Sequence, residues 1–126
     1  MNCMDIIDRV DIMEPNAYCP EQKLKWLSIL DGKIYEEVIR PCEESPAGFT
    51  EYSNGDEELI VPSPYDYDIY YHYLMAMIDA ENSETQRYNK RMTMFNNAYT
   101  EFINWYNKSH NRSRARPGKE PKHFLF

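Results

Sequence analysis

The sequence is poor in glycine and contains no long apolar run. It holds four Gly among 126 residues, and its formal net charge is −7. A phosphate-cradling loop needs several Gly close together, and neither such a loop nor a G-x-S-x-G turn occurs. We therefore expect neither a nucleotide-binding site nor an enzyme. No stretch approaches the roughly 18 apolar residues that a membrane span requires. The opening residues are acidic where a signal peptide would be basic, so we expect a protein made and kept in a cytoplasm.

Cysteine and histidine are also scarce. The three Cys form no C-x-x-C pair and have no His at zinc-ligand spacing, which favours reduced structural thiols. His72, with Asp68 one turn before it and Asp79 two turns after it, is the nearest approach to a ligand cluster. One His with scattered acids falls short of a stable metal site. The sequence therefore predicts no metal and no cofactor.

Aromatic residues are plentiful, with 14% of the chain and eleven Tyr. From Ser63 to His110 no Gly occurs and Pro64 is the only Pro, which predicts one long helix or a tight pair of helices. Large side chains and two polar interruptions recur there at alternating steps of four and three, in a heptad register. The positions are Tyr67, Tyr71, Leu74, Ile78, Glu81, Thr85, Tyr88, Met92, Phe95, Tyr99, Phe102 and Tyr106.

The start of this segment carries strong helix signals. Ser63 can cap the helix, Pro64 suits its first position, and Asp66 can complete a capping box. A single helix from there to Lys108 would be about 68 Å long, so it must project, kink or fold back. The break falls at 82–86, where the register is polar and Ser83 with Gln86 could form a second capping box. We favour a kinked or projecting helix because the register continues across this point.

Two shorter helices are expected before it. Asp5 to Met13 has one apolar face and stops before Pro15, and Cys19 to Arg40 has an apolar stripe and stops at Pro41. Residues 41–62 are rich in Pro and acids. The turn signal Asn54-Gly55 there predicts a loop or a small β-hairpin. The fold class is thus mainly α: a helical bundle with one very long or kinked C-terminal helix, a small loop or hairpin excursion, and an extended tail. We expect one domain over residues 1–110 and a basic tail over 111–126.

Charge is distributed unevenly along the chain. Residues 107–126 hold six of the fourteen Lys and Arg and one acid, so the rest of the chain carries about −12. The tail is either solvated, bound to an acidic neighbour or bound to nucleic acid. Its apolar ending, Phe124-Leu125-Phe126, favours a protein neighbour. The residues expected at interfaces are Tyr88, Met92, Phe95, Tyr99, Phe102, Tyr106, Arg112, Arg114, Arg116, Phe124, Leu125 and Phe126.

Several short runs resemble a family of small proteins from tailed bacteriophages and prophages of Firmicutes. They are Ile6-Ile7-Asp8-Arg9-Val10-Asp11, the run from Gln22 to Gly32, Leu59-Ile60-Val61-Pro62, Pro64-Tyr65-Asp66, Tyr71-His72-Tyr73-Leu74, Ile78-Asp79, Arg87-Tyr88-Asn89, Met94-Phe95-Asn96 and Trp105-Tyr106-Asn107. Members of this family are head-tail connectors, also called adaptor or head-completion proteins. The resemblance covers most of residues 1–110 and is weakest at 43–57 and in the tail.

This resemblance implies a structural virion protein at the neck, assembled in the host cytoplasm. It implies a dodecameric ring of copies of the chain beneath the portal protein, in contact with the next neck or tail-completion protein. DNA would pass through the lumen without specific binding. Ring subunits need interfaces in which one patch meets a different patch on the next copy. Two alternatives stay open: a nucleic-acid-binding or regulatory module that uses Arg112, Arg114, Arg116, Lys119 and Lys122, and another capsid or tail completion protein.

Overall fold

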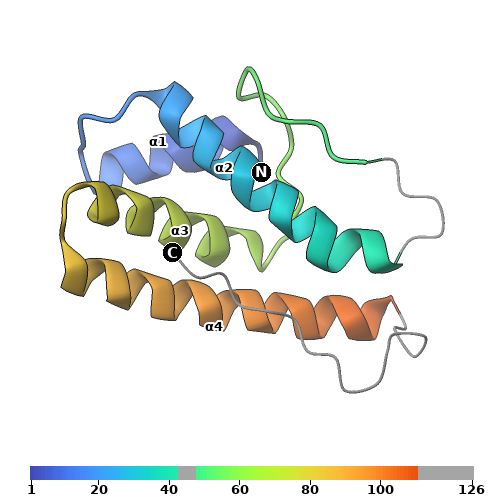
Figure 1. Cartoon of the computed structure of the whole chain (residues 1–126). Coiled ribbons are helices and arrows are strands. Elements are labelled where there is room, and N and C mark those ends of the chain that lie inside the picture. Colours follow the sequence, from blue (N-terminus) through green and yellow to red (C-terminus); the bar gives the residue numbers. More distant parts are fainter. Residues whose placement is uncertain (43–47, 111–126) are drawn as a thin grey trace.

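The computed structural model describes residues 1–42 and 48–110 as a layered bundle of helices. Its elements are α1 (Cys3–Met13), α2 (Pro20–Ile34), the π-helical turn η1 (Tyr35–Ile39), the 3-10 turn η2 (Arg40–Cys42), α3 (Asp66–Glu81) and α4 (Thr85–Ser109). Helix α3 lies in the middle, with α1 and α2 on one side and α4 on the other (Figure 1). The prediction of a mainly helical bundle is confirmed.

The first two helices form where the sequence predicts them. Helix α1 begins two residues early because Asn2 and Asp5 make a reciprocal capping box, each side chain accepting the other's backbone N–H at 2.9 Å. Pro20 stands at the start of α2, a position that needs no N–H donor. The predicted helix from Cys19 to Arg40 corresponds to α2 continued by η1, with a change to the wider π-helical turn at Tyr35.

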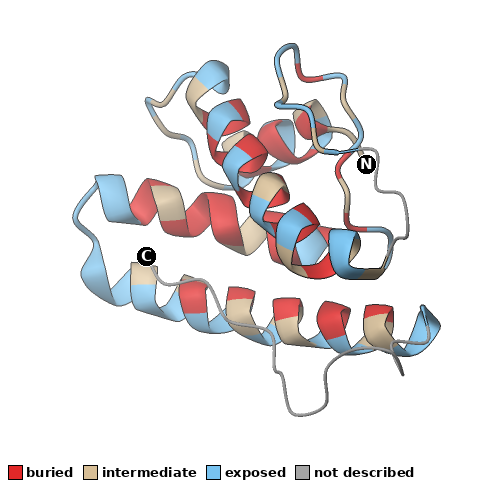
Figure 2. Ribbon diagram, turned by 45° about the vertical axis from the view of Figure 1, so that its right-hand side comes forward, coloured by how far each residue is buried: buried red, intermediate tan, exposed pale blue. Residues whose placement is uncertain are grey.

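The long segment is a helical hairpin, so the kinked or projecting helix that we favoured is wrong. Helices α3 and α4 run antiparallel and side by side (Figures 1 and 2). The chain reverses at Ser83, which has a left-handed φ of 60°. Two backbone bonds close the turn, from Ser83 N–H to Ala80 O at 3.1 Å and from Glu84 N–H to Asp79 O at 2.8 Å. The expected capping box of Ser83 and Gln86 does not form, since the N-cap is Glu84, whose side chain makes no capping hydrogen bond.

The start of α3 also differs from the prediction. The helix begins at Asp66, and its N-cap is Tyr65. Ser63 instead donates a long hydrogen bond of 3.4 Å to the Asp66 carboxylate, and the Ser63–Pro64 peptide is cis. The predicted start, with Ser63 as the cap and Pro64 as the first helical residue, is two residues early.

The described part of the excursion, residues 48–62, is a loop without strands. Its backbone groups bond elsewhere: Cys3 N–H donates to Glu57 O and Met4 N–H to Gly55 O, both at 3.1 Å. The Glu57 carboxylate accepts the N–H groups of Ser53 at 2.6 Å and Gly55 at 2.8 Å. These partners leave few free groups for a hairpin ladder, and a single bridge pairs Asn2 with Glu58 in the described chain. Of the predicted hairpin, the turn at Asn54 and Gly55 is present, with a φ of 96° at Gly55.

Candidate binding surfaces

The aromatic residues expected at an interface lie mainly inside the subunit. The side chains of Met92, Phe95, Tyr99, Phe102 and Tyr106 on α4 are all buried, and Tyr88 is partly buried. They pack against α3 and its neighbours; Tyr73 and Phe95, for example, have ring centroids 5.6 Å apart. In Figure 2 one side of α4 is buried against the bundle and the other is exposed. A neighbouring subunit cannot reach these five side chains in this conformation.

The other predicted interface residues are in the tail. Arg112, Arg114, Arg116, Phe124, Leu125 and Phe126 lie outside the described residues, as do Lys119 and Lys122. Their role stays a prediction.

Large apolar side chains are exposed at the end of α1 and near the start of α3. Ile12 is 74% exposed, Met13 57% and Tyr67 38%. Arg9 lies over the Tyr67 ring, 5.8 Å from its centre, which places the outer side of α1 next to Tyr67. Tyr67 in turn stacks on Tyr71 with centroids 5.2 Å apart. We call these five residues the α1/α3 patch. Tyr67 and Tyr71 belong to the heptad register predicted from the sequence, and the apolar face predicted for the first helix included Met13 but not Ile12.

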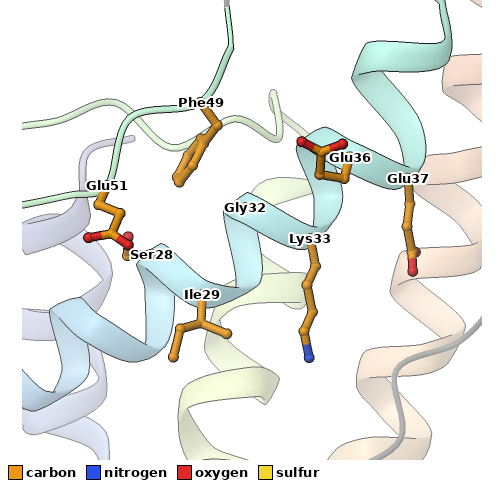
Figure 3. Close-up of a pocket in the computed structure, with 8 residues that line it drawn as sticks. All are labelled: Ser28, Ile29, Gly32, Lys33, Glu36, Glu37, Phe49 and Glu51. Atoms are coloured by element: carbon orange, nitrogen blue, oxygen red, sulfur yellow. The ribbon is translucent and has the colours of Figure 1, made fainter.

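A groove runs along the outer side of α2 and is closed above by residues 49–51 of the loop. Its volume is about 360 Å³. The apolar side chains of Ile29 and Phe49 line it together with Gly32 (Figure 3). Ser28, Lys33, Glu36, Glu37 and Glu51 complete the lining. Figure 3 shows Phe49 over Gly32, with Glu51 towards the Ser28 end and Glu36 towards η1.

The aromatic wall of the groove is held from both sides. Phe49 packs edge-on against Tyr52 at 5.3 Å and contacts Tyr35 at 6.4 Å between ring centroids. The Tyr35 hydroxyl accepts a hydrogen bond from Gly48 N–H at 2.8 Å. Ser28 accepts a bond from Tyr52 N–H at 3.1 Å. These contacts fix the loop on α2, so the groove is preformed.

The rim of the groove is acidic. It contains the three carboxylates of Glu36, Glu37 and Glu51 and the single ammonium of Lys33. Arg40 pairs with Glu36 at 2.9 Å, and both side chains are about 60% exposed. Glu37 accepts a bond of 3.0 Å from the Tyr99 hydroxyl. Negative charge around an apolar floor is suited to a ligand that is basic and apolar at once.

A buried carboxylate anchors the loop beneath this groove. Asp31 accepts hydrogen bonds from the hydroxyls of Tyr52 and Tyr70, the latter at 2.6 Å, and from Ile60 N–H at 3.1 Å. Burial raises the pKa of Asp31 to about 6, against the lowering effect of these bonds. Burial, together with the charge of the same carboxylate, raises the pKa of both tyrosines, so both stay neutral donors. This cluster is structural: every group in it is used to hold α2, α3 and the loop together.

The His72 and Asp79 pair does not form a metal site in the structure. Within residues 1–42 and 48–110, no group of three or more His, Cys, Asp or Glu is placed to hold a metal ion. Asp79 instead pairs with Arg91, whose Nε lies 3.8 Å from the carboxylate. Burial raises the pKa of Asp79, with a further contribution from the nearby Glu14, and burial lowers the pKa of His72.

None of the helices in the described part of the chain is both long enough and apolar enough to span a membrane. Comparisons of the sequence with protein-family models and with curated proteins, and of the fold with solved structures, find no match.

Proposed function

We propose that this chain is a non-catalytic structural subunit of a tailed-phage particle, a head-tail connector that forms a ring beneath the portal. The α1/α3 patch is the observation that carries the proposal. A subunit with its own closed core still exposes Ile12 and Met13 at the end of α1 and Tyr67 near the start of α3, and Arg9 of α1 lies over the Tyr67 ring. Burying a side chain of this size in an interface contributes about 1.5–3 kcal/mol. A ring interface on this patch would pair it with a different surface of the next copy.

The rest of the surface supports the same role. The long helix α4 turns an almost wholly polar side outward, with Met94 as its one exposed large apolar side chain in the described chain. The chain outside residues 107–126 carries about −12 of formal charge. A ring whose lumen is lined by acidic surface lets DNA slide without adhering. The resemblance of residues 1–110 to connector proteins favours this role over an unrelated assembly.

The test mixes the purified chain with the portal protein of the same phage or prophage. We expect rings that seat on the portal, seen by negative-stain microscopy and by mass measurement. Ile12→Asp places a charge in the interface and should abolish the rings while leaving the helical circular dichroism unchanged. Met94→Asp is the matched control, because it adds the same charge at an exposed apolar position outside the patch, and it should assemble normally.

Three outcomes would contradict the proposal. The first is that the wild-type chain does not bind the portal. The second is that the Ile12→Asp variant assembles as well as the control. The third is tight DNA binding that weakens steeply with salt, which would favour the nucleic-acid module instead.

A further inference from the structure

We propose that the groove along α2 is the docking site for residues 111–126 of the same chain, with the apolar run Phe124 to Phe126 in the cavity. The contact is made in the lone subunit. The docking can therefore be tested whether or not the chain forms a ring.

Charge complementarity is the first argument. Residues 111–126 contain five Lys and Arg and one Glu. The groove presents three carboxylates against one Lys. Glu51 stands at the loop side of the groove and is exposed, without a hydrogen bond to its side chain among the described residues. The basic side chains that precede the apolar run would meet this acidic rim, whereas an acidic segment would be repelled from it.

The shape of the groove is the second argument. Its volume of about 360 Å³ lies at the small end of the roughly 300–1,000 Å³ typical of ligand pockets. A cavity of this size suits one or two large side chains of an extended segment rather than a folded domain. Phe49 offers an aromatic wall, and Ile29 leaves 45% of its surface exposed on the floor. Aromatic side chains bury much apolar area and add favourable ring contacts.

Reach is the third argument. The hydrogen bond from Tyr99 on α4 to Glu37 on η1 places α4 next to one end of the groove, because Glu37 lines the groove there. Helix α4 continues from Tyr99 to Ser109, about 15 Å further. Its end and the η1 end of α2 lie at the same end of the bundle (Figure 1). The fourteen residues that follow His110, up to Phe124, can span at most about 48 Å, so the segment is long enough to return to its own groove.

Tethering makes the same chain the favoured occupant. A segment joined to the subunit by a short linker is present at an effective concentration on the order of millimolar. An individually weak contact is then largely occupied within one chain, and a second copy competes only at high concentration. If the chain assembles into a ring, a partner that takes the groove must first displace this segment.

The experiment compares full-length variants by ¹⁵N NMR. Phe124→Ala with Phe126→Ala removes the apolar anchors, and Glu51→Lys reverses a charge on the rim. Glu101→Lys, on the exposed side of α4, is the matched control for that charge reversal. In the wild type we expect backbone order parameters above about 0.6 near Phe124, falling below that value in both test variants. The Gly32 amide should shift in the same two variants and not in the control.

Each of three other results would overturn the proposal. Order parameters below about 0.6 near Phe124 in the wild type mean that the segment is free. Gly32 shifts that disappear on roughly hundredfold dilution mean that the groove binds a second copy instead, because a tethered contact is independent of concentration. An equal effect of Glu101→Lys means that the attraction is one of net charge and not of the groove.

Discussion

The hydroxyl of Tyr70 on α3 donates a hydrogen bond of 2.6 Å to Asp31 on α2, and both side chains are fully buried. The same hydroxyl accepts a bond of 3.0 Å from Val61 N–H. Two helices and the loop between them are thus joined at one polar point inside an apolar core. Because Asp31 titrates there at a raised pKa, this point also makes the stability of the subunit depend on pH.

The first prediction concerns the Asp31→Asn variant. Burial raises the pKa of Asp31 from 3.8 to about 6, so protonation favours the folded state. Protonated Asp31 contributes its full stabilisation at pH values below the pKa of this residue in the unfolded chain, and the contribution is lost as the pH rises through about 6. Asn does not titrate. The free energy of unfolding of the wild type should therefore fall by about 3 kcal/mol relative to the variant as the pH rises from acidic to neutral.

Urea unfolding of both proteins across this pH range measures the difference. The depressed pKa of Glu57, which its bonds from backbone N–H groups lower to about 2, acts in the opposite direction. It is present in both proteins and cancels. Parallel pH profiles for the two proteins would show that Asp31 is not the titrating group.

The sequence pattern could predict the helices but not which of them cover one another. A heptad register indicates which side of a helix is apolar, and it is the same whether that side faces another subunit or the next helix of a hairpin. Leu74 and Ile78 on α3 and Phe95 and Tyr99 on α4 keep one register and are all buried within the bundle. The place of the reversal was identified correctly, yet the register itself argued for the wrong alternative.

The polar cluster and the groove were less accessible to sequence reasoning. Asp31 follows Leu27 by four residues and so falls on the buried side of α2. A carboxylate on the apolar side of a helix is unusual and can be recognised from the sequence. Its partners were not detectable, because nothing local distinguishes Tyr52 and Tyr70 from the other nine Tyr. The groove forms because the loop brings Phe49 back over Gly32 of α2. Sequence patterns describe the loop and the helix one at a time and do not predict a contact between them.

The second prediction is that Ser83→Gly stabilises the protein. Ser83 turns the chain between α3 and α4 with a φ of 60°, a conformation that costs an L-residue about 1 kcal/mol and Gly almost nothing. Its side chain is exposed. We expect a gain of about 0.5–1 kcal/mol in the free energy of unfolding. Ser83→Ala is the control, since it removes the hydroxyl and keeps the strained φ; equal stability of the two variants would contradict this explanation.

The third prediction is that Gly32→Ala also stabilises, for a different reason. Gly32 lies inside α2, and a Cβ there would sit 3.6 Å from the Phe49 ring, an ordinary contact distance. The gain in helix propensity should be about 0.5–1 kcal/mol. Thermal unfolding followed by circular dichroism measures it. A loss of stability would show that Phe49 is pressed against the helix more tightly than the 3.6 Å contact indicates.

The fourth prediction separates backbone strain from steric contact at two loop glycines. Gly48 and Gly55 both have left-handed φ values, 91° and 96°. A Cβ at Gly48 would meet nothing within 4 Å, whereas at Gly55 it would lie 2.7 Å from Cγ of Met4. Gly48→Ala should therefore cost about 1 kcal/mol, the backbone term alone. Gly55→Ala should cost about 1–3 kcal/mol more, because the loop must move away from α1.

The excess at Gly55 can be assigned to Met4 by a double-mutant cycle. If the clash with Met4 is its cause, Met4→Ala removes the obstacle and the cost of Gly55→Ala in that background falls to that of Gly48→Ala. The backbone bond from Met4 N–H to Gly55 O, at 3.1 Å, does not involve the side chain and is kept. Chemical unfolding of the four proteins gives the coupling energy. Additive costs would mean that strain in the loop itself, and not its packing on α1, requires glycine at this position.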